Sequence, residues 1–263
     1  MISAEALRRI ARRQGIGVGW AEKDYVISWL LKELYENECL NEALVFKGGT
    51  ALKKVYFPET WRLSHDLDFT AIATLDSDVI GRCLEDVFSS VAQKSGLILR
   101  LDSLKPIRGG VDAKIQFTGP LVYKNQLSLD ITFDEILVTE PEWRTVATAY
   151  PDVLSIRVKV YSLREILAEK IRSIMQRGKS RDYYDVWRLL EENDFDMSDM
   201  WALLVEKCRT KGIEYDPGLI FDEERLREAE RYWQVALGEL VTELPDFKVV
   251  KSALREKLAS LYS

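Results

Sequence analysis

Apolar positions at helical spacing dominate the first part of the chain. Within the first 40 residues they predict helices, and the clearest stripe contains Tyr25, Ile27, Trp29, Leu30, Leu31, Leu34 and Tyr35. The apolar run 43–46 stops at Gly48-Gly49, which predicts a buried strand that enters a tight turn. Residues 50–56 have the pattern of the start of a helix, residues 67–72 that of a second strand, and residues 78–94 that of another helix.

Alternation of apolar and polar residues marks the next part of the chain. Strand-like segments follow at 97–102, 113–118 and 127–133. The last of these places Leu127, Leu129, Ile131 and Phe133 on one face and Ser128, Asp130 and Thr132 on the other. Such a strand should have one buried and one polar face. A less regular stretch lies between Pro141 and Pro151.

Helical patterns fill the rest of the chain. Ser162 and Glu165 have the spacing of a capping box, Gly178 is expected to end the helix that they begin, and Ser180 to cap the next one. Further helical patterns cover 197–211, 222–240 and 246–262. We therefore expect an α+β fold: a mixed sheet with flanking helices in residues 1–155, followed by a helical domain in residues 156–263.

Composition narrows the class of protein. The 263 residues are 47% hydrophobic and 30% charged, which is ordinary for a globular protein, and no apolar run resembles a signal peptide or a transmembrane helix. Cys39, Cys83 and Cys208 are odd in number and far apart, which suggests neither a disulfide framework nor a zinc site, so a reducing cytoplasm is the expected location. The net charge of −6 argues against a protein that coats nucleic acid without specificity.

One stretch is nevertheless basic. Between residues 157 and 181 the only acidic residues are Glu165 and Glu169. A run of charges is usually a solvated helix face, but it can also be a surface for phosphates. In the second case the RNA-binding residues would be Arg157, Lys159, Arg172, Arg177, Lys179 and Arg181.

Two short motifs suggest nucleotide chemistry. Gly48-Gly49 lies between a predicted strand and a predicted helix, where glycine permits a close approach and the helix start offers N–H groups to a phosphate. Alone, such a pair is more often an ordinary turn. Asp66 and Asp68 are two positions apart in a strand, so their carboxylates face the same way and would be relieved by a divalent cation. Asp130, on the polar face of another strand, could complete a two-metal site or could be an ordinary exposed residue.

A lysine and two aspartates interrupt apolar helix faces in the second half. Lys170 falls inside the apolar arc of its predicted helix, so it either has a partner or extends its ammonium group to water. Asp182 lies on the apolar side of the next helix and Asp185 at its edge, although an Asp in a first turn also suits the helix dipole. Together they indicate one polar cluster within a core. His65 should point away from Asp66 and Asp68.

These motifs, taken in order, resemble those of a known enzyme family. The segments 47–52 (KGGTAL) and 62–69 (RLSHDLDF), followed by 169–171 (EKI) and 181–185 (RDYYD), are similar to the motifs of the AbiEii/AbiGii nucleotidyltransferases. That family belongs to the DNA polymerase β-like superfamily and includes the MenT toxins. The resemblance spans roughly residues 43–190, and His65 stands where an acidic residue is expected.

The resemblance implies a role for each matching residue. Asp66 and Asp68 would bind Mg²⁺ or Mn²⁺, with Asp130 as a possible third metal ligand, and Lys170 would contact the triphosphate. Asp182 or Asp185 would complete the catalytic residues, and the choice between them is open. The nucleotide phosphates would lie against Lys47, Gly48, Gly49, Thr50, Ser64 and Lys170.

The resemblance also implies a reaction. The chain would be the toxin of a type IV toxin–antitoxin or abortive-infection system, transferring a nucleoside monophosphate from an NTP to RNA, notably the acceptor end of a tRNA, and an AbiEi-type antitoxin would oppose it. Two alternatives stay open: a protein or small-molecule hydroxyl as acceptor, which the acidic composition favours slightly, and a non-catalytic binding module with this fold.

Overall fold

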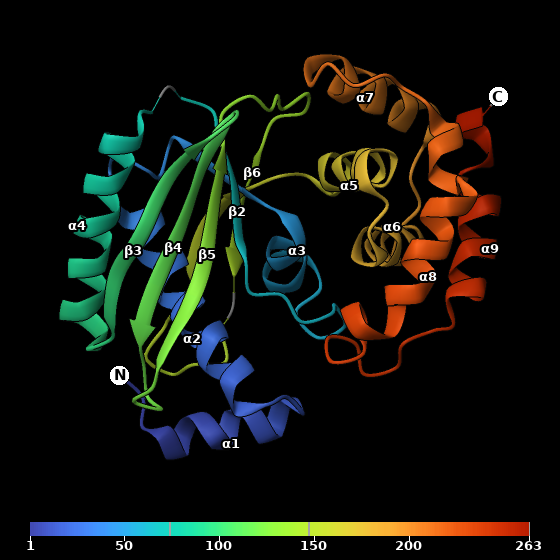
Figure 1. Cartoon of the computed structure of the whole chain (residues 1–263). Helices are drawn as coiled ribbons and strands as arrows, with labels where there is room; N and C mark the ends of the chain where they lie inside the picture. The colour runs from blue at the N-terminus through green and yellow to red at the C-terminus, as the bar shows by residue number, and fades with distance from the viewer. Residues whose placement is uncertain (74, 147, 263) are drawn as a thin grey trace. The chain divides into compact units, whose positions relative to one another are not determined.

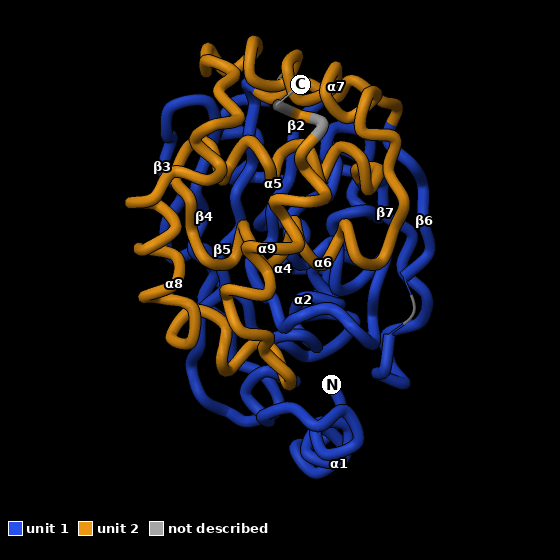
Figure 2. The backbone as a smooth tube through the Cα atoms, turned by 90° about the vertical axis from the view of Figure 1, so that its right-hand side faces the viewer, with its two compact units in different colours: residues 1–134, 141–160 blue, residues 135–140, 161–263 orange. Residues whose placement is uncertain are grey.

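The computed structural model describes residues 1–73, 75–146 and 148–262. The chain forms two compact units (Figure 2). Unit 1 contains residues 1–134 and 141–160, and unit 2 contains residues 135–140 and 161–263. The segment Glu135–Glu140 therefore belongs to the second unit, although the chain on both sides of it belongs to the first.

A seven-stranded mixed sheet forms the centre of unit 1, with the strand order β3-β4-β5-β2-β1-β7-β6 (Figure 1). Its strands are β1 (Leu44–Lys47), β2 (Leu67–Ala71), β3 (Ile98–Ile107), β4 (Gly110–Thr118), β5 (Lys124–Thr132), β6 (Glu142–Val146) and β7 (Ile156–Val160). The pairs β1–β7 and β2–β5 are parallel, and the other neighbouring pairs are antiparallel. The mixed sheet confirms the α+β prediction.

Two strands were not expected from the sequence. The stretch between Pro141 and Pro151 contains β6, which is the edge strand and exposes all its residues except Val146, so no alternation marks it. β7 follows it in antiparallel pairing and also pairs with β1 through Phe46 and Val160. Because of these two strands, the sheet extends to Val160, five residues beyond the end expected for the first domain.

Helices α2 (Val18–Glu36) and α4 (Ser77–Ser95) cover one face of the sheet, α4 lying against β3 (Figure 1). The apolar residues of β4 and β5 are at most 1% exposed, and they are Val111, Ala113, Ile115, Phe117, Leu127, Leu129 and Ile131. Helix α1 (Ala4–Gln14) precedes α2. A disulfide joins Cys39, after α2, to Cys83 of α4, although the number and spacing of the cysteines did not suggest a disulfide framework.

The turn after β1 leads directly into a short helical segment. Helix α3 (Gly48–Ala51) continues as a π-helical turn, η1 (Leu52–Tyr56). The helix thus begins at the glycine pair itself, two residues earlier than the sequence pattern predicted. The N–H groups of its first turn therefore belong to the glycines and Thr50.

Unit 2 is helical. It contains α5 (Leu163–Arg177), α6 (Ser180–Glu192), α7 (Met197–Thr210), η2 (Pro217–Phe221), α8 (Glu223–Leu237), α9 (Phe247–Lys257) and η3 (Ala259–Tyr262). Helix α5 packs against α6 and α7, and α6 packs against α8 and α9.

The predicted helix ends are partly confirmed. The Ser162 hydroxyl accepts the Glu165 N–H, and Gly178 ends α5 in the left-handed conformation. The cap predicted at Ser180 was wrong, because Lys179 is the N-cap of α6 and the Ser180 hydroxyl donates to the Ala229 carbonyl. Ser180 is the first residue of α6 and is buried, so its hydroxyl bonds to a neighbouring helix and does not cap its own helix.

Buried charges fix the Glu135–Glu140 segment within unit 2. Both terminal nitrogens of Arg172 donate to the Glu135 carboxylate, at 2.8 and 2.7 Å. The Lys207 ammonium, fully buried, lies 2.6 Å from Glu165 and donates to the Ile136 carbonyl at 3.0 Å. Glu165 also accepts the N–H groups of Val138 and Thr139. Its carboxylate therefore holds the crossing segment and does not complete a capping box.

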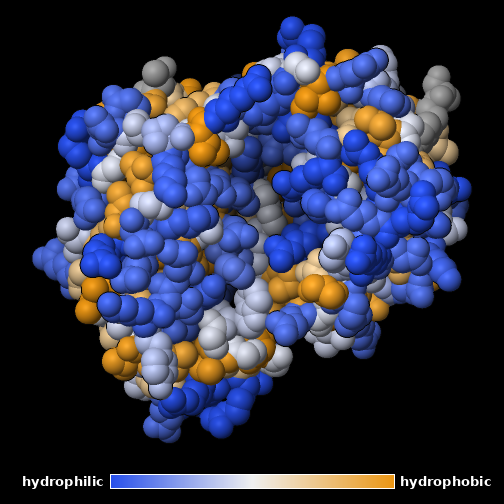
Figure 3. Space-filling view, viewed as in Figure 1, coloured by the Kyte–Doolittle hydropathy of each residue, from blue (hydrophilic) through white to orange (hydrophobic). Residues whose placement is uncertain are grey.

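Hydrophilic residues cover most of the molecular face seen in Figure 3, on both units, with apolar residues scattered among them. Within the described residues, no helix combines the length and apolar character that crossing a membrane requires.

Candidate active site

The glycine pair at the start of α3 lies directly against candidate catalytic side chains. Gly48 has φ = 78°, and a Cβ atom there would collide with the Asp68 carboxylate. A Cβ atom at Gly49 would lie 2.9 Å from Nη2 of Arg62 and 3.0 Å from Oγ of Ser64. A side chain at either position would displace its neighbours. The backbone here can approach other groups closely only because both residues are glycine.

Thr50 ties this turn to the approach of β2. Its buried hydroxyl donates to the Asp66 carbonyl at 2.6 Å, and its oxygen lies 2.9 Å from that of Ser64. Lys47, the N-cap residue of α3, is also buried. The predicted nucleotide-binding residues of unit 1 are therefore adjacent in the structure.

Three aspartates stand in a row across neighbouring strands. Asp68 on β2 pairs with Asp130 on β5, and Asp130 pairs with Asp112 on β4. Residues paired in this way point to the same face of a sheet, and neighbouring strands are about 4.8 Å apart. The sequence prediction of Asp130 beside Asp68 is thus matched by the register. Asp112 is an acidic residue that the sequence reasoning missed.

Crowding of these carboxylates changes their acidity. Burial raises the pKa of Asp130 to about 7, and a hydrogen bond with Asp112 and the negative charges of Asp68 and Asp112 act in the same direction. The pKa of Asp112 is lowered, chiefly by its hydrogen bond with Lys114. A site that makes a carboxylate hold its proton near neutral pH has an excess of negative charge, which favours a bound cation.

Lys114 is a second residue that the sequence reasoning missed. Its ammonium group donates to Asp112 at 3.0 Å and to Ser128 at 3.1 Å. The hydrogen bond to Asp112 raises the pKa of Lys114, and the charges of Asp130 and Asp66 contribute as well. Asp112 and Lys114 alternate on the polar face of β4, which is the signal that could have indicated them.

The donor set suits a hard divalent cation, although it is not a complete cage. Among residues 1–73, 75–146 and 148–262, no group of three or more His, Cys, Asp or Glu side chains is placed to hold a metal ion. Asp66, Asp68 and Asp130 are thus not gathered into one such group. Mg²⁺ in nucleotide enzymes commonly takes one or two carboxylates and completes its shell with phosphates and water. Asp68 and Asp130, paired and mutually repelling, fit that requirement.

In unit 2, Lys170 meets both predicted aspartates. Its ammonium lies 2.8 Å from Asp185 and 3.5 Å from Asp182, and its side chain is 15% exposed. Asp185 was expected at the edge of the apolar face of its helix, but it is fully buried. Asp182 also accepts hydrogen bonds from Arg177 at 2.9 and 3.2 Å. The predicted polar cluster within a core is therefore confirmed.

The basic stretch divides into surface and interior residues. Arg157 is exposed and lies over the Trp143 ring, whereas Lys159 is buried and pairs with Glu42. Arg172 is buried against Glu135, so its guanidinium is absent from the surface on which it was predicted. The remaining members are Arg177, paired with Asp182, Lys179, paired with Glu228, and Arg181, which donates to the Ala236 carbonyl.

His65 has an aromatic neighbour. Its ring centroid lies 4.7 Å from that of Trp20, with the two planes tilted by 58°. This contact joins the segment that carries Ser64 and Asp66 to helix α2.

Comparisons with known proteins bear on the family and the fold. The model of the family "Nucleotidyl transferase AbiEii toxin, Type IV TA system" matches residues 29–260. Among solved structures, the chain is similar to "MenT4, nucleotidyltransferase toxin" from Mycobacterium tuberculosis H37Rv, with 20% identity and a TM-score of 0.76. That match covers 100% of this chain and 90% of the other. A comparison with curated protein sequences gives no match.

The glycine turn, the aspartate row and these comparisons define the protein class: the chain is a nucleotidyltransferase. More particularly, it belongs to the AbiEii family of type IV toxins, because the family model covers most of its length. The TM-score independently shows that the fold is shared with a nucleotidyltransferase toxin. An enzyme of this class uses a nucleoside triphosphate, and generally a divalent metal ion, and a type IV system pairs the toxin with an antitoxin.

Proposed function

We propose that this enzyme transfers a nucleoside monophosphate from an NTP to RNA, and that the acceptor is the end of a tRNA. The metal ion is Mg²⁺, for which Mn²⁺ can substitute. A terminal hydroxyl oxygen of the RNA attacks the α-phosphorus, the bond from that phosphorus to the α,β-bridging oxygen breaks, and pyrophosphate leaves. The hydroxyl proton passes to a nearby base, for which the carboxylate of Asp130 is suited when it is ionised.

The pairing of Asp68 with Asp130 beside the glycine turn is the observation that supports this proposal most. The backbone of Gly48, Gly49 and Thr50 would hold the triphosphate, helped by Lys47 and Ser64. Asp68 and Asp130, with Asp66 next to them, would hold the metal. When bound, such an ion neutralises charge on the phosphates and lowers the pKa of the attacking hydroxyl.

Residues of unit 2 would act on the triphosphate. Lys170 would donate to phosphate oxygens, while Asp185 and Asp182 hold its ammonium in a fixed position. A lysine oriented by buried carboxylates loses less conformational entropy when it meets its ligand. The shorter contact is with Asp185, so we assign the larger positioning role to Asp185 and a supporting role to Asp182.

RNA would meet the exposed members of the basic stretch. These are Arg157 of unit 1 and Arg177, Lys179 and Arg181 of unit 2. Lys159 and Arg172 are left out because they are buried against Glu42 and Glu135. In the cell, we propose that the enzyme acts in the cytoplasm, arrests growth by blocking tRNA, and is opposed by an antitoxin of the AbiEi type.

Nucleotide transfer to isolated RNA tests the proposal. The protein is incubated with Mg²⁺, each α-labelled NTP in turn, and total RNA, beside Asp68→Asn and Asp130→Asn variants. Asp86→Asn, in which an exposed aspartate of α4 is changed, is the matched control. We expect label in tRNA-sized RNA with the unaltered protein and the control, and a loss of at least about 100-fold in both site variants.

Other results would change the proposal in defined ways. Label found in protein or in a small molecule would move the acceptor away from RNA. Equal label with the Asp68 variant would remove the metal role of that residue. No transfer with any NTP or acceptor would leave a binding module.

A further inference from the structure

Helix α1 has a basic face in a protein that is acidic overall. The chain has a net charge of −6, whereas α1 contains four arginines and only one carboxylate, that of Glu5. At about 100° per residue, the four arginines fall within an arc of about 140° on one side of the helix. All four are exposed, and they are Arg8, Arg9, Arg12 and Arg13. This arginine face is therefore a local attraction for anions on a molecule of opposite net charge.

The opposite face of α1 is already used in the fold. Leu7, Ile10 and Ala11 are at most 4% exposed, and the helix packs against α2. A helix that lies in a membrane surface needs a free apolar face to enter the lipid, and the apolar face of α1 is occupied. Within α1, every residue of which the structure describes, no large apolar side chain is exposed, so the helix also lacks the apolar centre of a typical protein interface.

The four arginines are not balanced by carboxylates within the described chain. Among residues 1–73, 75–146 and 148–262, none of them forms an ion pair. Arg12 and Arg13 lie in the last turn, where a cation suits the helix dipole, but Arg8 and Arg9 lie nearer the middle of the helix. Like charges three or four positions apart repel each other and destabilise a helix. An anion from outside the chain would remove this repulsion.

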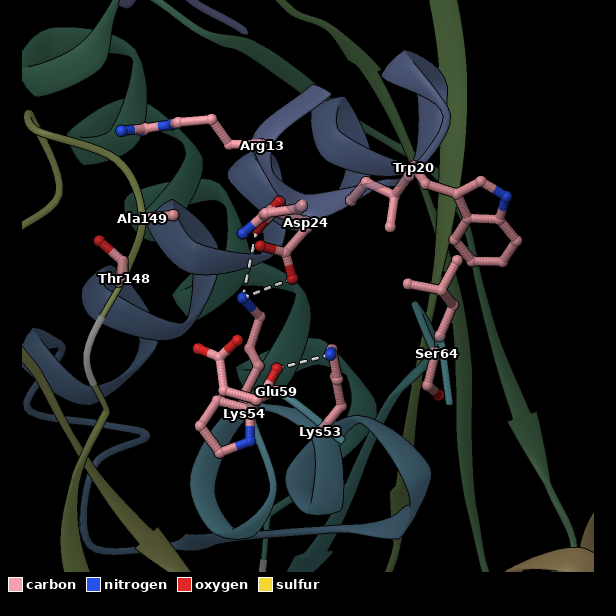
Figure 4. Close-up of a pocket in the computed structure, with 13 residues that line it drawn as sticks. Arg13, Trp20, Asp24, Lys53, Lys54, Glu59, Ser64, Thr148 and Ala149 are labelled. Carbon is pink, nitrogen blue, oxygen red and sulfur yellow. Dashed lines mark hydrogen bonds and ion pairs between the residues drawn. The ribbon is translucent and has the colours of Figure 1, made fainter. Parts of the chain in front are cut away.

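Arg9 and Arg13 define an anion site within the arginine face. They are four positions apart, so both extend from the same side of α1. They line an open hollow of about 280 Å³ together with residues 148–151, and none of its described lining residues is acidic. Figure 4 shows the Arg13 guanidinium turned away from Lys53 and lying on the side of Ala149. Two guanidinium groups beside one hollow are donors suited to the oxygens of a phosphate group.

The wall of the hollow that faces α1 is anchored to α2. The Tyr150 hydroxyl lies 2.9 Å from the Ala21 carbonyl and 2.9 Å from the Asp24 carboxylate, and Tyr150 is 2% exposed. Asp24 is itself paired with Lys54 at 2.7 Å, so its negative charge is compensated. Helix α1 packs against the same α2, which therefore holds both sides of the hollow. A site that is held in place before its ligand arrives loses less entropy on binding.

The arginine face begins close to the reaction centre of unit 1. Arg13 also borders a neighbouring cavity of about 390 Å³, and Ser64 borders the same cavity (Figure 4). Ser64 contacts Thr50, whose hydroxyl donates to the Asp66 carbonyl. Helix α1 and the aspartate row both belong to unit 1. A polymer whose end lies at the aspartate row can therefore pass Ser64 and continue onto α1.

We propose that the arginine face of α1 binds the phosphodiester backbone of the acceptor RNA, and that one phosphate lies in the hollow between Arg9 and Arg13. This rests on the proposed function, since it assumes that the acceptor is RNA. The start of α3 binds the triphosphate of the NTP, and α1 binds the RNA behind its reacting end. The local basic face explains how a protein with a net negative charge holds a polyanion.

Binding and transfer are measured separately to test this. Anisotropy of 5′-fluorescein-labelled bulk tRNA follows binding in EDTA without NTP, over a series of salt concentrations. Transfer with Mg²⁺ and the preferred α-labelled NTP gives kcat and the KM for each substrate. The variants are Arg9→Met/Arg13→Met and Arg9→Lys/Arg13→Lys, and thermal melting verifies that each is folded. Methionine and lysine both have nearly the helix propensity of arginine.

A matched control removes the same charge from another helix. Arg227 and Arg231 of α8 are exposed and are also four positions apart. The variant Arg227→Met/Arg231→Met therefore changes the net charge by as much as the methionine variant of α1. It separates a specific contact with α1 from a general effect of charge on RNA binding.

The methionine variant of α1 should weaken tRNA binding about 10-fold and reduce the slope of log K against log salt by about 1.5, as expected for two lost phosphate contacts. The KM for tRNA should rise about 10-fold, while kcat and the KM for the NTP stay unaltered. The lysine variant keeps the charge, so it should retain the salt slope and weaken binding less. The α8 control should bind tRNA like the unaltered protein.

The outcomes distinguish this inference from the proposed function. If the unaltered protein labels tRNA but the α1 variants bind it normally, or the α8 control loses as much affinity, the inference is wrong and the function stands. Displacement of tRNA by poly-L-glutamate as readily as by unlabelled RNA would assign α1 to an acidic protein segment instead. If the unaltered protein labels no RNA with any NTP, the proposed function fails, and the binding measurements still decide whether α1 binds RNA.

Discussion

Gly48 shows how a single backbone angle can fix a site. Its positive φ and the carboxylate of Asp68 beside it both exclude a side chain. The glycine pair is therefore required sterically, and not only as a phosphate-binding turn. In the sequence alone, a Gly-Gly pair is weak evidence for a nucleotide site. In the structure, the contacts with Asp68, Arg62 and Ser64 show why both positions have to be glycine.

We expect Gly48→Ala to reduce nucleotide transfer at least about 10-fold and to destabilise the fold by about 1–3 kcal/mol, because a strained backbone angle adds to the displacement of Asp68. Transfer assays and urea unfolding measure the two effects. Gly19→Ala is the matched control: Gly19 lies in α2 with no heavy atom within 4 Å of an added Cβ. The Gly19→Ala variant should have a free energy of unfolding up to about 1 kcal/mol higher than that of the unaltered protein. Full activity in Gly48→Ala would contradict the steric argument.

Asp130 gives the molecule a characteristic dependence on pH. Its pKa is about 7 in the folded chain against an ordinary 3.8, so between these values the folded state keeps a proton that the unfolded state has lost. This contribution to stability is present at pH 4 and is lost as the pH rises through 7.

We expect Asp130→Asn, in EDTA, to match the unaltered protein near pH 4 and to exceed it by about 1–2 kcal/mol at pH 8, a figure reduced for solvent screening. Urea unfolding at a series of pH values measures this, with Asp86→Asn as the control. Addition of Mg²⁺ should remove most of the difference, because a bound cation stabilises the ionised carboxylate. A constant difference at every pH would mean that Asp130 does not titrate in this range.

Among the elements, α5 and α7 enclose buried charges as well as apolar side chains. Lys207 of α7 contacts Glu165 and lies 3.4 Å from both Glu135 and Glu169. Removing a buried cation from among carboxylates leaves uncompensated charge, which costs more than the pair contributes.

We expect Lys207→Met to lower the free energy of unfolding by about 3–5 kcal/mol. The double variant Lys207→Met/Glu165→Gln should recover part of that loss, since one of the stranded charges is removed. A double-mutant cycle measured by urea unfolding tests this coupling. The exposed Lys248 of α9, changed to Met, should have an effect within about 0.5 kcal/mol. Strictly additive losses would argue against a shared network.

Elements with strong periodicity were predictable, and elements defined by their partners were not. Strand β5 was recognised because Leu127, Leu129 and Ile131 alternate with polar residues. Strand β6 was missed because an edge strand has no buried face to mark it. Lys170 and Asp182 were found from their positions on apolar helix faces.

Contacts across the sheet could not be read from the chain. Asp112 joins the aspartate row only through the register of β4 with β5, which is set by pairing and not by sequence spacing. The Cys39–Cys83 disulfide and the partnership of Arg172 with Glu135 likewise depend on residues far apart in sequence. Arg172 was therefore assigned to a surface that it does not reach.

At the scale of the whole molecule, neither unit is one continuous piece of chain. Unit 1 is interrupted by residues 135–140, which supply Glu135 to unit 2. A helical fragment that starts at residue 161 therefore lacks the carboxylate that binds Arg172 and Lys207.

We expect the isolated fragment 161–263 to lack a cooperative thermal transition, because it would bury two cations without Glu135. The fragment 1–160 retains all seven strands and should melt cooperatively. Circular dichroism and heteronuclear NMR spectra of both fragments measure this. A fragment 161–263 with the dispersed spectrum of a packed protein would show that the Glu135 contacts are dispensable.

The excursion of residues 135–140 also sets an order of events during protein synthesis. Glu135 leaves the ribosome 72 residues before Lys207, so these two residues can form their buried contact only after α7 has been synthesised. The sheet and its aspartate row can be complete by then, whereas Lys170 is still without its finished surroundings. Because α5, which carries Lys170, packs against α7, we expect chains that end before α7 to lack a fully packed α5 and the nucleotide transfer proposed for the whole chain.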